Sequence, residues 1–201
     1  MNVTIADFGT GNLHSLKKAL ERVGAEAVHI SQEIDEWLGA DVLVLPGDGA
    51  FGPFMKPLQD HIEPIKVRIV ERPTLGICVG MQILFESSGE NADVSGLGLL
   101  NGALERLPAE RLPHMGWNQV VHNDHPLFKS IDSAEYFYFV HTYGVLESDA
   151  AIATATYGVE FAAAVEVGPA SFGVQFHPEK SGQWGLKLLE NYLELVKVGV
   201  S

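Results

Sequence analysis

The sequence contains very little cysteine and few basic residues, and each scarcity restricts what the protein can be. Cys78 is the only cysteine among 201 residues, so no internal disulfide can form and any special role of Cys78 must come from its free thiol. Thirteen lysines and arginines stand against 26 aspartates and glutamates, which gives a net charge of −13. Such a charge repels phosphate backbones and anionic bilayers, so we expect no nucleic-acid partner and no membrane partner.

Long apolar runs are also missing. The longest runs fall far short of the roughly 20 residues that a membrane-spanning helix needs, and the first residues lack the basic segment that opens a secretory signal. We therefore expect a cytoplasmic protein. Apolar residues still make up 46% of the chain, which is enough for a packed core, and the length fits one domain over residues 1–201.

The hydrophobic pattern alternates between short apolar runs and helical periodicity in the first half of the chain. It predicts strands at residues 2–6, 27–30, 40–45 and 73–78, and helices at 13–23, 54–70 and 80–87, with Pro57 and Pro64 bending or interrupting the second helix. From residue 98 onward the pattern favours strands or hairpins at 99–104, 136–141, 151–156, 161–167 and 171–176, before a final helix from about residue 181. The predicted fold class is α/β, with an open, mostly parallel sheet, helices on both faces and smaller antiparallel extensions.

Cys78 lies between a predicted strand and a predicted helix, with Gly76 and Gly80 two residues away on either side. A nucleophile held on such a tight turn needs neighbours without side chains, as in the Gly-x-Ser-x-Gly elbow of serine hydrolases. The start of the following helix favours a thiolate and offers backbone N–H groups to an oxyanion. The pattern alone is also compatible with a strand end that carries an incidental thiol, so a catalytic role requires a base.

A base is available in His177, which follows the last predicted strand and precedes Pro178 and Glu179. The carboxyl ends of parallel strands share one edge of a sheet, so His177 and Cys78 can meet there. Glu179 can then orient the imidazole and stabilise its cationic form, as the acid of a catalytic triad does. We expect Cys78, His177 and Glu179 to form a Cys-His-Glu triad.

Acyl transfer also requires an oxyanion hole. The backbone N–H of Val79 is one candidate, and the glycine-rich segment that follows the third predicted strand provides two more, at Asp48 and Gly49. This segment could also be a phosphate cradle, but no lysine follows it as a P-loop requires.

These motifs resemble the class I, triad-type glutamine amidotransferases over the whole chain. Within that class, segments 9–13, 76–88, 113–118 and 139–143 are similar to the glutaminase subunits of imidazole glycerol phosphate synthase. The resemblance implies a flavodoxin-like core and hydrolysis of L-glutamine to L-glutamate and ammonia in histidine biosynthesis, through a glutamyl thioester on Cys78. It implies no cofactor and no metal. It also implies a substrate-binding set made of Gln82, Glu90, His141, Thr142 and Tyr143.

One position departs from the family pattern. The family usually has a small apolar residue such as valine where this chain has Asp48. A carboxylate that pointed at a developing oxyanion would be unfavourable, so we expect the Asp48 side chain to point toward solvent or an outside donor.

The resemblance also implies a partner, because ammonia released in water becomes ammonium and loses its nucleophilicity. The partner in this family is a separate (β/α)₈-barrel cyclase, which uses the ammonia to make imidazole glycerol phosphate and an aminoimidazole carboxamide ribotide (AICAR). Asn12, Trp117 and Lys180 match interface positions of the resulting heterodimer. From sequence alone Trp117 could equally be a core aromatic, and Lys180 a solvated surface charge.

Other motifs of the sequence point only weakly to other functions. The Gly9-x-Gly11 pair is a poor dinucleotide fingerprint because His14 occupies the position of the third glycine. His122, Asp124 and His125 are more typical of a polar loop than of a metal site. A glutaminase for another synthase, such as those for anthranilate or pyridoxal phosphate, and a non-catalytic binding module on the same fold remain as alternatives.

Overall fold

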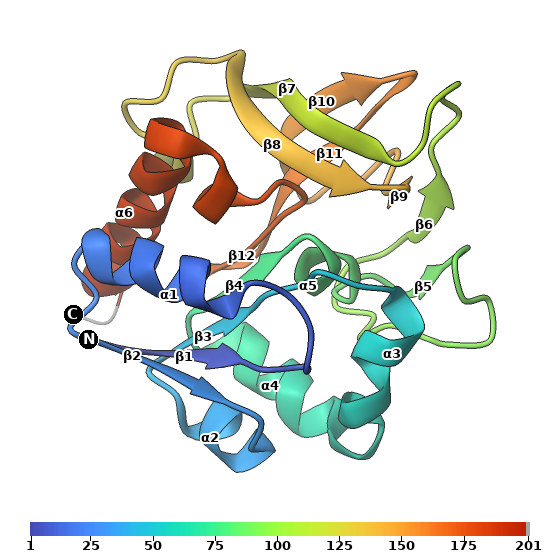
Figure 1. The fold of residues 1–201 in the computed structure, drawn as a ribbon. Helices are drawn as coiled ribbons and strands as arrows, with labels where there is room; N and C mark the ends of the chain where they lie inside the picture. The colour runs from blue at the N-terminus through green and yellow to red at the C-terminus, as the bar shows by residue number, and fades with distance from the viewer. Residues whose placement is uncertain (200–201) are drawn as a thin grey trace.

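The computed structural model describes residues 1–199, and a nine-stranded sheet runs through them (Figure 1). Its strand order is β2-β1-β3-β4-β12-β11-β10-β7-β8. The first five strands in this order are parallel, and the remaining four continue the same sheet with antiparallel pairings. Their bounds are β1 Asn2–Ala6, β2 Ala27–Ser31, β3 Val42–Leu45, β4 Thr74–Ile77, β7 His114–His122, β8 Glu135–His141, β10 Ala151–Tyr157, β11 Val159–Gly168 and β12 Ser171–Val174.

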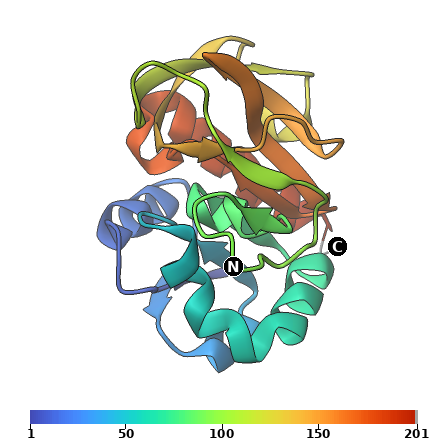
Figure 2. The same ribbon diagram turned by 90° about the vertical axis from the view of Figure 1, so that its right-hand side faces the viewer.

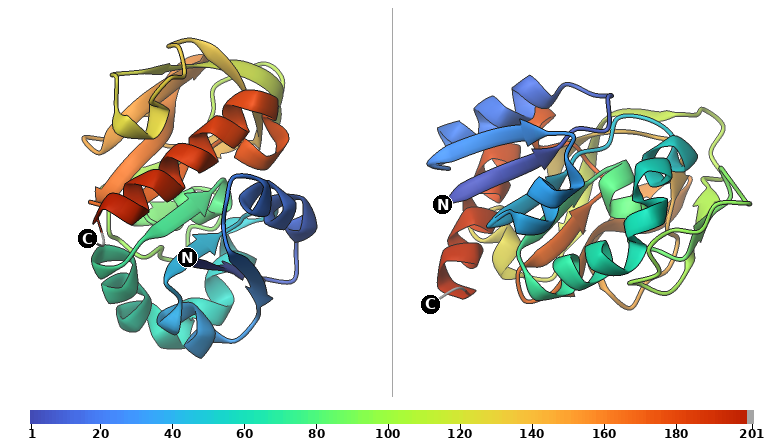
Figure 3. Two further views of the ribbon diagram at one scale, coloured as in Figure 1. Left: turned by 90° about the vertical axis from the view of Figure 1, so that its left-hand side faces the viewer. Right: turned by 90° about the horizontal axis from the view of Figure 1, so that it is seen from below.

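Helices cover both faces of the parallel half of the sheet. α1 (Leu13–Arg22) and the long α6 (Gly182–Gly199) pack together on one face, while α2 (Ile34–Gly39) and α4 (Ile62–Glu71) cover the other (Figure 3). Strands β3 and β4 are buried along their whole length, as expected for central parallel strands. The predicted α/β fold is therefore confirmed. None of the helices described within residues 1–199 is long and apolar enough to cross a membrane.

The antiparallel strands stand above the parallel ones as a curved extension (Figure 2). A small sheet of β5 (Ser87–Ser88), β6 (Ala103–Arg106) and β9 (Tyr143–Gly144) lies beside it. Short 3₁₀ helices complete the described part: η1 Lys56–His61, η2 Pro126–Phe128 and η3 Pro178–Lys180.

Two predicted helices differ from those observed. The prolines divide the expected helix 54–70 into α3 (Phe51–Met55), η1 and α4. The expected helix 80–87 ends early, as α5 (Val79–Gln82), because the carbonyls of residues 83–86 accept hydrogen bonds from residues 96–100 instead of continuing the helix. The same bonds delay the strand expected at 99–104, which begins only at Ala103.

Candidate active site

The edge formed by the carboxyl ends of the parallel strands brings Cys78 and His177 together. Strands β4 and β12 are parallel neighbours, and Ile77 pairs with Val174 at their ends. Cys78 follows β4 directly, and its backbone N–H donates to the Val174 carbonyl at 2.8 Å. His177 follows β12, and its backbone N–H donates to the Tyr138 carbonyl of β8 at 2.8 Å. The predicted meeting of the two residues is thus a consequence of strand order.

The turn at Cys78 has the strained geometry of a nucleophile elbow. Cys78 has φ 53° and ψ −107°, which a residue with a side chain rarely adopts and which costs of order 1–3 kcal/mol. Glycines make the turn possible: a Cβ at Gly76 would lie 2.4 Å from the Gly80 carbonyl oxygen, and one at Gly80 would lie 1.9 Å from the Leu45 carbonyl oxygen. A Cβ at Gly47 would collide with Val79. The three segments therefore pack backbone against backbone at Cys78.

His177 is buried and is oriented by Glu179. Its Nδ1 lies 2.9 Å from Glu179 Oε1, while its Nε2 makes no hydrogen bond within residues 1–199. Burial lowers the pKa of His177, but the neighbouring Cys78 sulfur and the Glu179 carboxylate raise it by more, to about 10. The imidazolium form therefore predominates at neutral pH.

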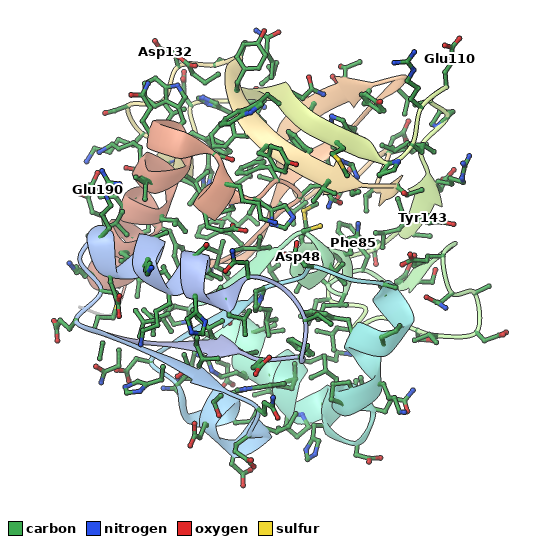
Figure 4. The ribbon with its side chains drawn as sticks, viewed as in Figure 1. Asp48, Phe85, Glu110, Asp132, Tyr143 and Glu190 are labelled. Atoms are coloured by element: carbon green, nitrogen blue, oxygen red, sulfur yellow. The ribbon has the colours of Figure 1, made fainter. Side chains whose placement is uncertain are left out.

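The Asp48 side chain faces into the site. Its Oδ1 lies 3.4 Å from His177 Nε2, and both of its carboxylate oxygens accept from Lys180 Nζ at 3.3 Å. Figure 4 labels Asp48 near the centre of the molecule. The expectation that this carboxylate meets a donor is fulfilled by Lys180, but the expectation that it points away from the catalytic groups was wrong. The attraction of the buried imidazolium explains the difference.

This contact predicts the effect of removing the charge. In the arrangement observed, the Asp48 carboxylate competes with the Cys78 sulfur for the imidazolium and would repel an oxyanion. We expect Asp48→Val and the isosteric Asp48→Asn to raise the glutaminase rate of the isolated chain about fivefold, or about 1 kcal/mol, a modest effect because the pair is partly solvated. Steady-state ammonia release measures it. Loss of activity in both variants would show instead that the carboxylate is required.

The residues predicted to form the oxyanion hole line the cleft at Cys78. The N–H of Val79 belongs to the first turn of α5, where backbone amides have no partner within the helix. Asp48 and Gly49 line the same cleft as Cys78 and Val79. The close approach of Gly47 to Val79 fixes the distance between the two sources of amide groups.

A cleft of about 280 Å³ opens above Cys78 and contains every predicted substrate-binding residue in its lining. Gln82 is buried, and its Nε2 donates to the Tyr143 carbonyl at 3.0 Å. Glu90 lies at the rim, where its Oε2 accepts from the Phe51 N–H at 2.8 Å. Its second carboxylate oxygen can still receive an ammonium group.

The segment of His141, Thr142 and Tyr143 forms the opposite wall of the cleft. The His141 ring nitrogens are occupied, Nδ1 by the Tyr143 carbonyl at 2.9 Å and Nε2 by His114 Nδ1 at 2.9 Å. Burial lowers the pKa of His141 to about 3, so the ring is neutral. The His141 side chain therefore supports the wall, and Thr142 and Tyr143 are the residues of this segment that can contact the substrate.

The three predicted interface residues lie near one another at the mouth of the site. Lys180 contacts Asp48, and a Cβ at Gly11, next to Asn12, would lie 3.3 Å from the Asp48 Cβ. Trp117 is 55% exposed, so it is no core aromatic, and it lies against Gly182 just beyond Lys180. A small cavity is lined by both Asn12 and His177.

Sequence reasoning missed some residues of the site. The buried Gln175 contacts Cys78 directly, and Val140 and Pro113 complete the lining of the cleft. The Gln-Phe-His order could have drawn attention to Gln175, since it precedes the base by two residues. Elsewhere, His122 and His125 bond to the Ile131 carbonyl and the Leu127 N–H, and no metal-binding cluster occurs within the described residues.

Comparison with known proteins agrees with this geometry. The family model of class I glutamine amidotransferases matches residues 4–195. The chain is 45% identical to imidazole glycerol phosphate synthase subunit HisH of Moorella thermoacetica, over 97% of this chain and 95% of that one. It is 46% identical to the HisH subunit of Vibrio cholerae, over 96% and 98%.

Solved structures agree in fold. The structure of PurLQS from Thermotoga maritima matches with a TM-score of 0.68 at 20% identity, over 100% of this chain and 99% of that one. A Trypanosoma brucei CTPS glutaminase domain with bound acivicin matches with a TM-score of 0.64 at 15% identity, over 100% and 94%. The sequence matches over nearly full length show that the chain belongs to the class I glutamine amidotransferases and, within them, to the HisH subunits of imidazole glycerol phosphate synthase.

Proposed function

We propose that Cys78, His177 and Glu179 are the catalytic triad through which this chain hydrolyses glutamine. As a HisH-type glutaminase subunit, the chain is a glutamine-hydrolysing enzyme of histidine biosynthesis. The observation that carries the residue assignment is the elbow at Cys78 beside an imidazole that Glu179 holds at 2.9 Å. The assignment of roles follows from the chemistry of acyl transfer.

In the first half of the reaction the Cys78 thiolate attacks the side-chain amide carbon of glutamine. The carbonyl oxygen takes up the electron pair and is stabilised by the N–H groups of Val79, Asp48 and Gly49. His177 then gives its proton to the amide nitrogen, the carbon–nitrogen bond breaks, and ammonia leaves a glutamyl thioester on Cys78.

In the second half His177, now neutral, takes a proton from water. The resulting hydroxide attacks the thioester carbon and the carbon–sulfur bond breaks. The new carboxyl group loses its proton to solvent, glutamate is released, and the thiolate is regenerated. Glu179 remains ionised throughout and stabilises the imidazolium each time it forms.

The substrate is held along the cleft. Glu90 presents its remaining carboxylate oxygen to the α-amino group, and Gln82 with residues 141–143 forms the wall along the amino-acid end. No cofactor or metal has a role in these steps.

We further propose that the ammonia passes to a separate cyclase with a (β/α)₈ barrel, bound over Asn12, Trp117 and Lys180 as a heterodimer. Support comes from an exposed apolar face on the β7–β8 hairpin. Met115, Trp117 and Tyr136 are each more than half exposed there, and the Trp117 and Tyr138 rings meet edge to face at 6.1 Å. Exposed aromatic anchors beside an active-site mouth are typical of protein interfaces.

The interface assignment predicts a loss of affinity on truncation of Trp117. We expect Trp117→Ala to weaken cyclase binding about 30-fold, or about 2 kcal/mol, with the thermal midpoint unchanged because the side chain is exposed. Isothermal titration against the cyclase measures it. Val67→Ala on α4, another exposed apolar residue, is the control. Equal affinities for the two variants would contradict the proposed docking surface.

We also propose that the chain forms a single domain. Residues 1–201 are proposed to form one glutamine amidotransferase domain, which the continuous nine-stranded sheet within residues 1–199 supports. The cytoplasmic location expected from the sequence stays a prediction.

A further inference from the structure

A buried glutamine lies between the nucleophile and the wall of the cleft. Gln175 follows β12 directly and has no exposed surface. Because Ile77 pairs with Val174, the next residues of the two strands, Cys78 and Gln175, lie side by side. The Gln175 Nε2 lies 3.5 Å from the Cys78 sulfur, and its Oε1 accepts from Gln82 Nε2 at 3.1 Å.

The hydrogen-bond network determines which end of the Gln175 amide faces the sulfur. The Tyr143 carbonyl can only accept, so the Gln82 atom 3.0 Å away must be its NH₂ group. The second hydrogen of that group points to Gln175, which must therefore present its oxygen to Gln82. The NH₂ group of Gln175 is then left to face Cys78.

The Tyr143 carbonyl is itself fixed. It also accepts from His141 Nδ1 at 2.9 Å, and the neutral His141 ring accepts from His114 on its other nitrogen. His114 has its own partner in Asn118, at 3.2 Å. A chain of buried polar groups thus locks the orientation of Gln175, because rotating its amide would place its NH₂ group against the NH₂ group of Gln82, two donors together.

The sulfur has few other neutral partners. The Val140 carbonyl lies 3.7 Å away, but it is an acceptor and can pair only with the protonated thiol. Gln175 therefore supplies a fixed side-chain donor that can pair with the thiolate. The charged or titratable groups around the sulfur are His177 and Glu179 after β12, Asp48 and its partner Lys180, Glu90 at the cleft rim and the neutral His141 of β8.

We propose that Gln175 is a positioning residue for the nucleophile: its amide N–H, locked by Gln82, holds the Cys78 sulfur as a thiolate beside His177. The expected effect of this contact on catalysis rests on the proposed role of Cys78 as the nucleophile. As the sulfur attacks, its charge moves to the substrate oxygen, and the donor has already fixed the direction of attack. No substrate contact is assigned to Gln175.

The test compares Gln175→Met, which keeps the length of the side chain without the donor, with Gln175→Glu, which puts a carboxylate beside the sulfur. Alkylation of Cys78 by iodoacetamide is followed against pH in the full chain. We expect the midpoint of the profile to rise by about one pH unit in Gln175→Met, and by at least as much in Gln175→Glu. The exposed Gln59→Met is the matched control and should leave the midpoint unchanged.

Steady-state kinetics in the complex provide a second readout. We expect the kcat of Gln175→Met to fall about tenfold with KM within about twofold, because the effect is on the nucleophile and not on substrate binding. An unchanged alkylation midpoint in folded Gln175→Met would overturn the proposal. The alkylation result does not depend on catalysis. A wrong triad assignment would be recognised separately, by glutaminase activity in a Cys78→Ala variant.

A measurement on the unaltered chain covers the case in which the variants do not fold. The side-chain amide protons of Gln175 can be followed by NMR through the pH range in which Cys78 alkylation changes. We expect their resonances to move with the same midpoint. Resonances that stay constant through that range would contradict a hydrogen bond to the sulfur.

Discussion

Replacing Cys78 by alanine is expected to lower glutamine hydrolysis by the complex with the proposed cyclase subunit about 10⁴-fold or more. The covalent route requires a thiolate beside His177, and Cys78 is the only cysteine of the chain. The neighbouring imidazolium and carboxylate cannot form a thioester in its place. Ammonia release, coupled to an amination or dehydrogenase assay, measures the loss.

The controls for this variant are that it keeps its fold and still binds the cyclase. Cys78 is 4% exposed and sits at a backbone turn, so removing its sulfur opens only a small cavity. We expect cyclase binding within about threefold of the unaltered chain, and synthesis from added ammonia should remain. A Cys78→Ala variant that kept more than about a tenth of the glutaminase rate would contradict nucleophilic catalysis by this residue.

The second large effect is expected at Gly80. A Cβ there would lie 1.9 Å from the Leu45 carbonyl oxygen and 2.8 Å from its carbon, both part of a buried central strand. Neither atom can move without displacing β3 or the elbow. We expect Gly80→Ala to lower the free energy of unfolding by about 3 kcal/mol, at the upper end of the range for overpacked sites, and to abolish measurable glutaminase activity.

Gly39→Ala is the matched control, because a Cβ at Gly39, in the last turn of α2, would meet nothing within 4 Å. Urea unfolding of both variants measures the difference. A small stabilisation is expected at Gly39, since alanine has the higher helix propensity. If Gly80→Ala were as stable and as active as Gly39→Ala, the close packing of β3 against the elbow would be wrong.

The sequence predicted the parallel half of the fold well because its signals are local. Asn2–Ala6 has the predicted bounds, and β3, β4 and α1 differ from theirs by one or two residues. Short buried strands bounded by Gly and Pro are identified by hydrophobicity alone. The six-residue α2 and the strand β7 were not predicted, since the first is too short for a periodic pattern and the second has polar residues on both faces.

The contrast between local sequence signals and long-range contacts also explains which parts of the site could be predicted. Cys78, His177 and Glu179 could be placed together because parallel strands end on one edge. The inward position of Asp48 could not be predicted, since it depends on the imidazole of His177 and on Lys180, which both lie far from Asp48 in the sequence. Gln175 was overlooked for a related reason: its role depends on the register between β4 and β12 and on the locked Tyr143 carbonyl.

The most direct test of the account is covalent labelling of the chain by a reactive glutamine analogue, read by peptide mass spectrometry in the presence of the cyclase. We expect one adduct, on the peptide that contains Cys78, formed at least about 100-fold more slowly in His177→Asn. A complex that releases ammonia from glutamine but acquires no label on Cys78, or acquires it on another residue, would contradict the account.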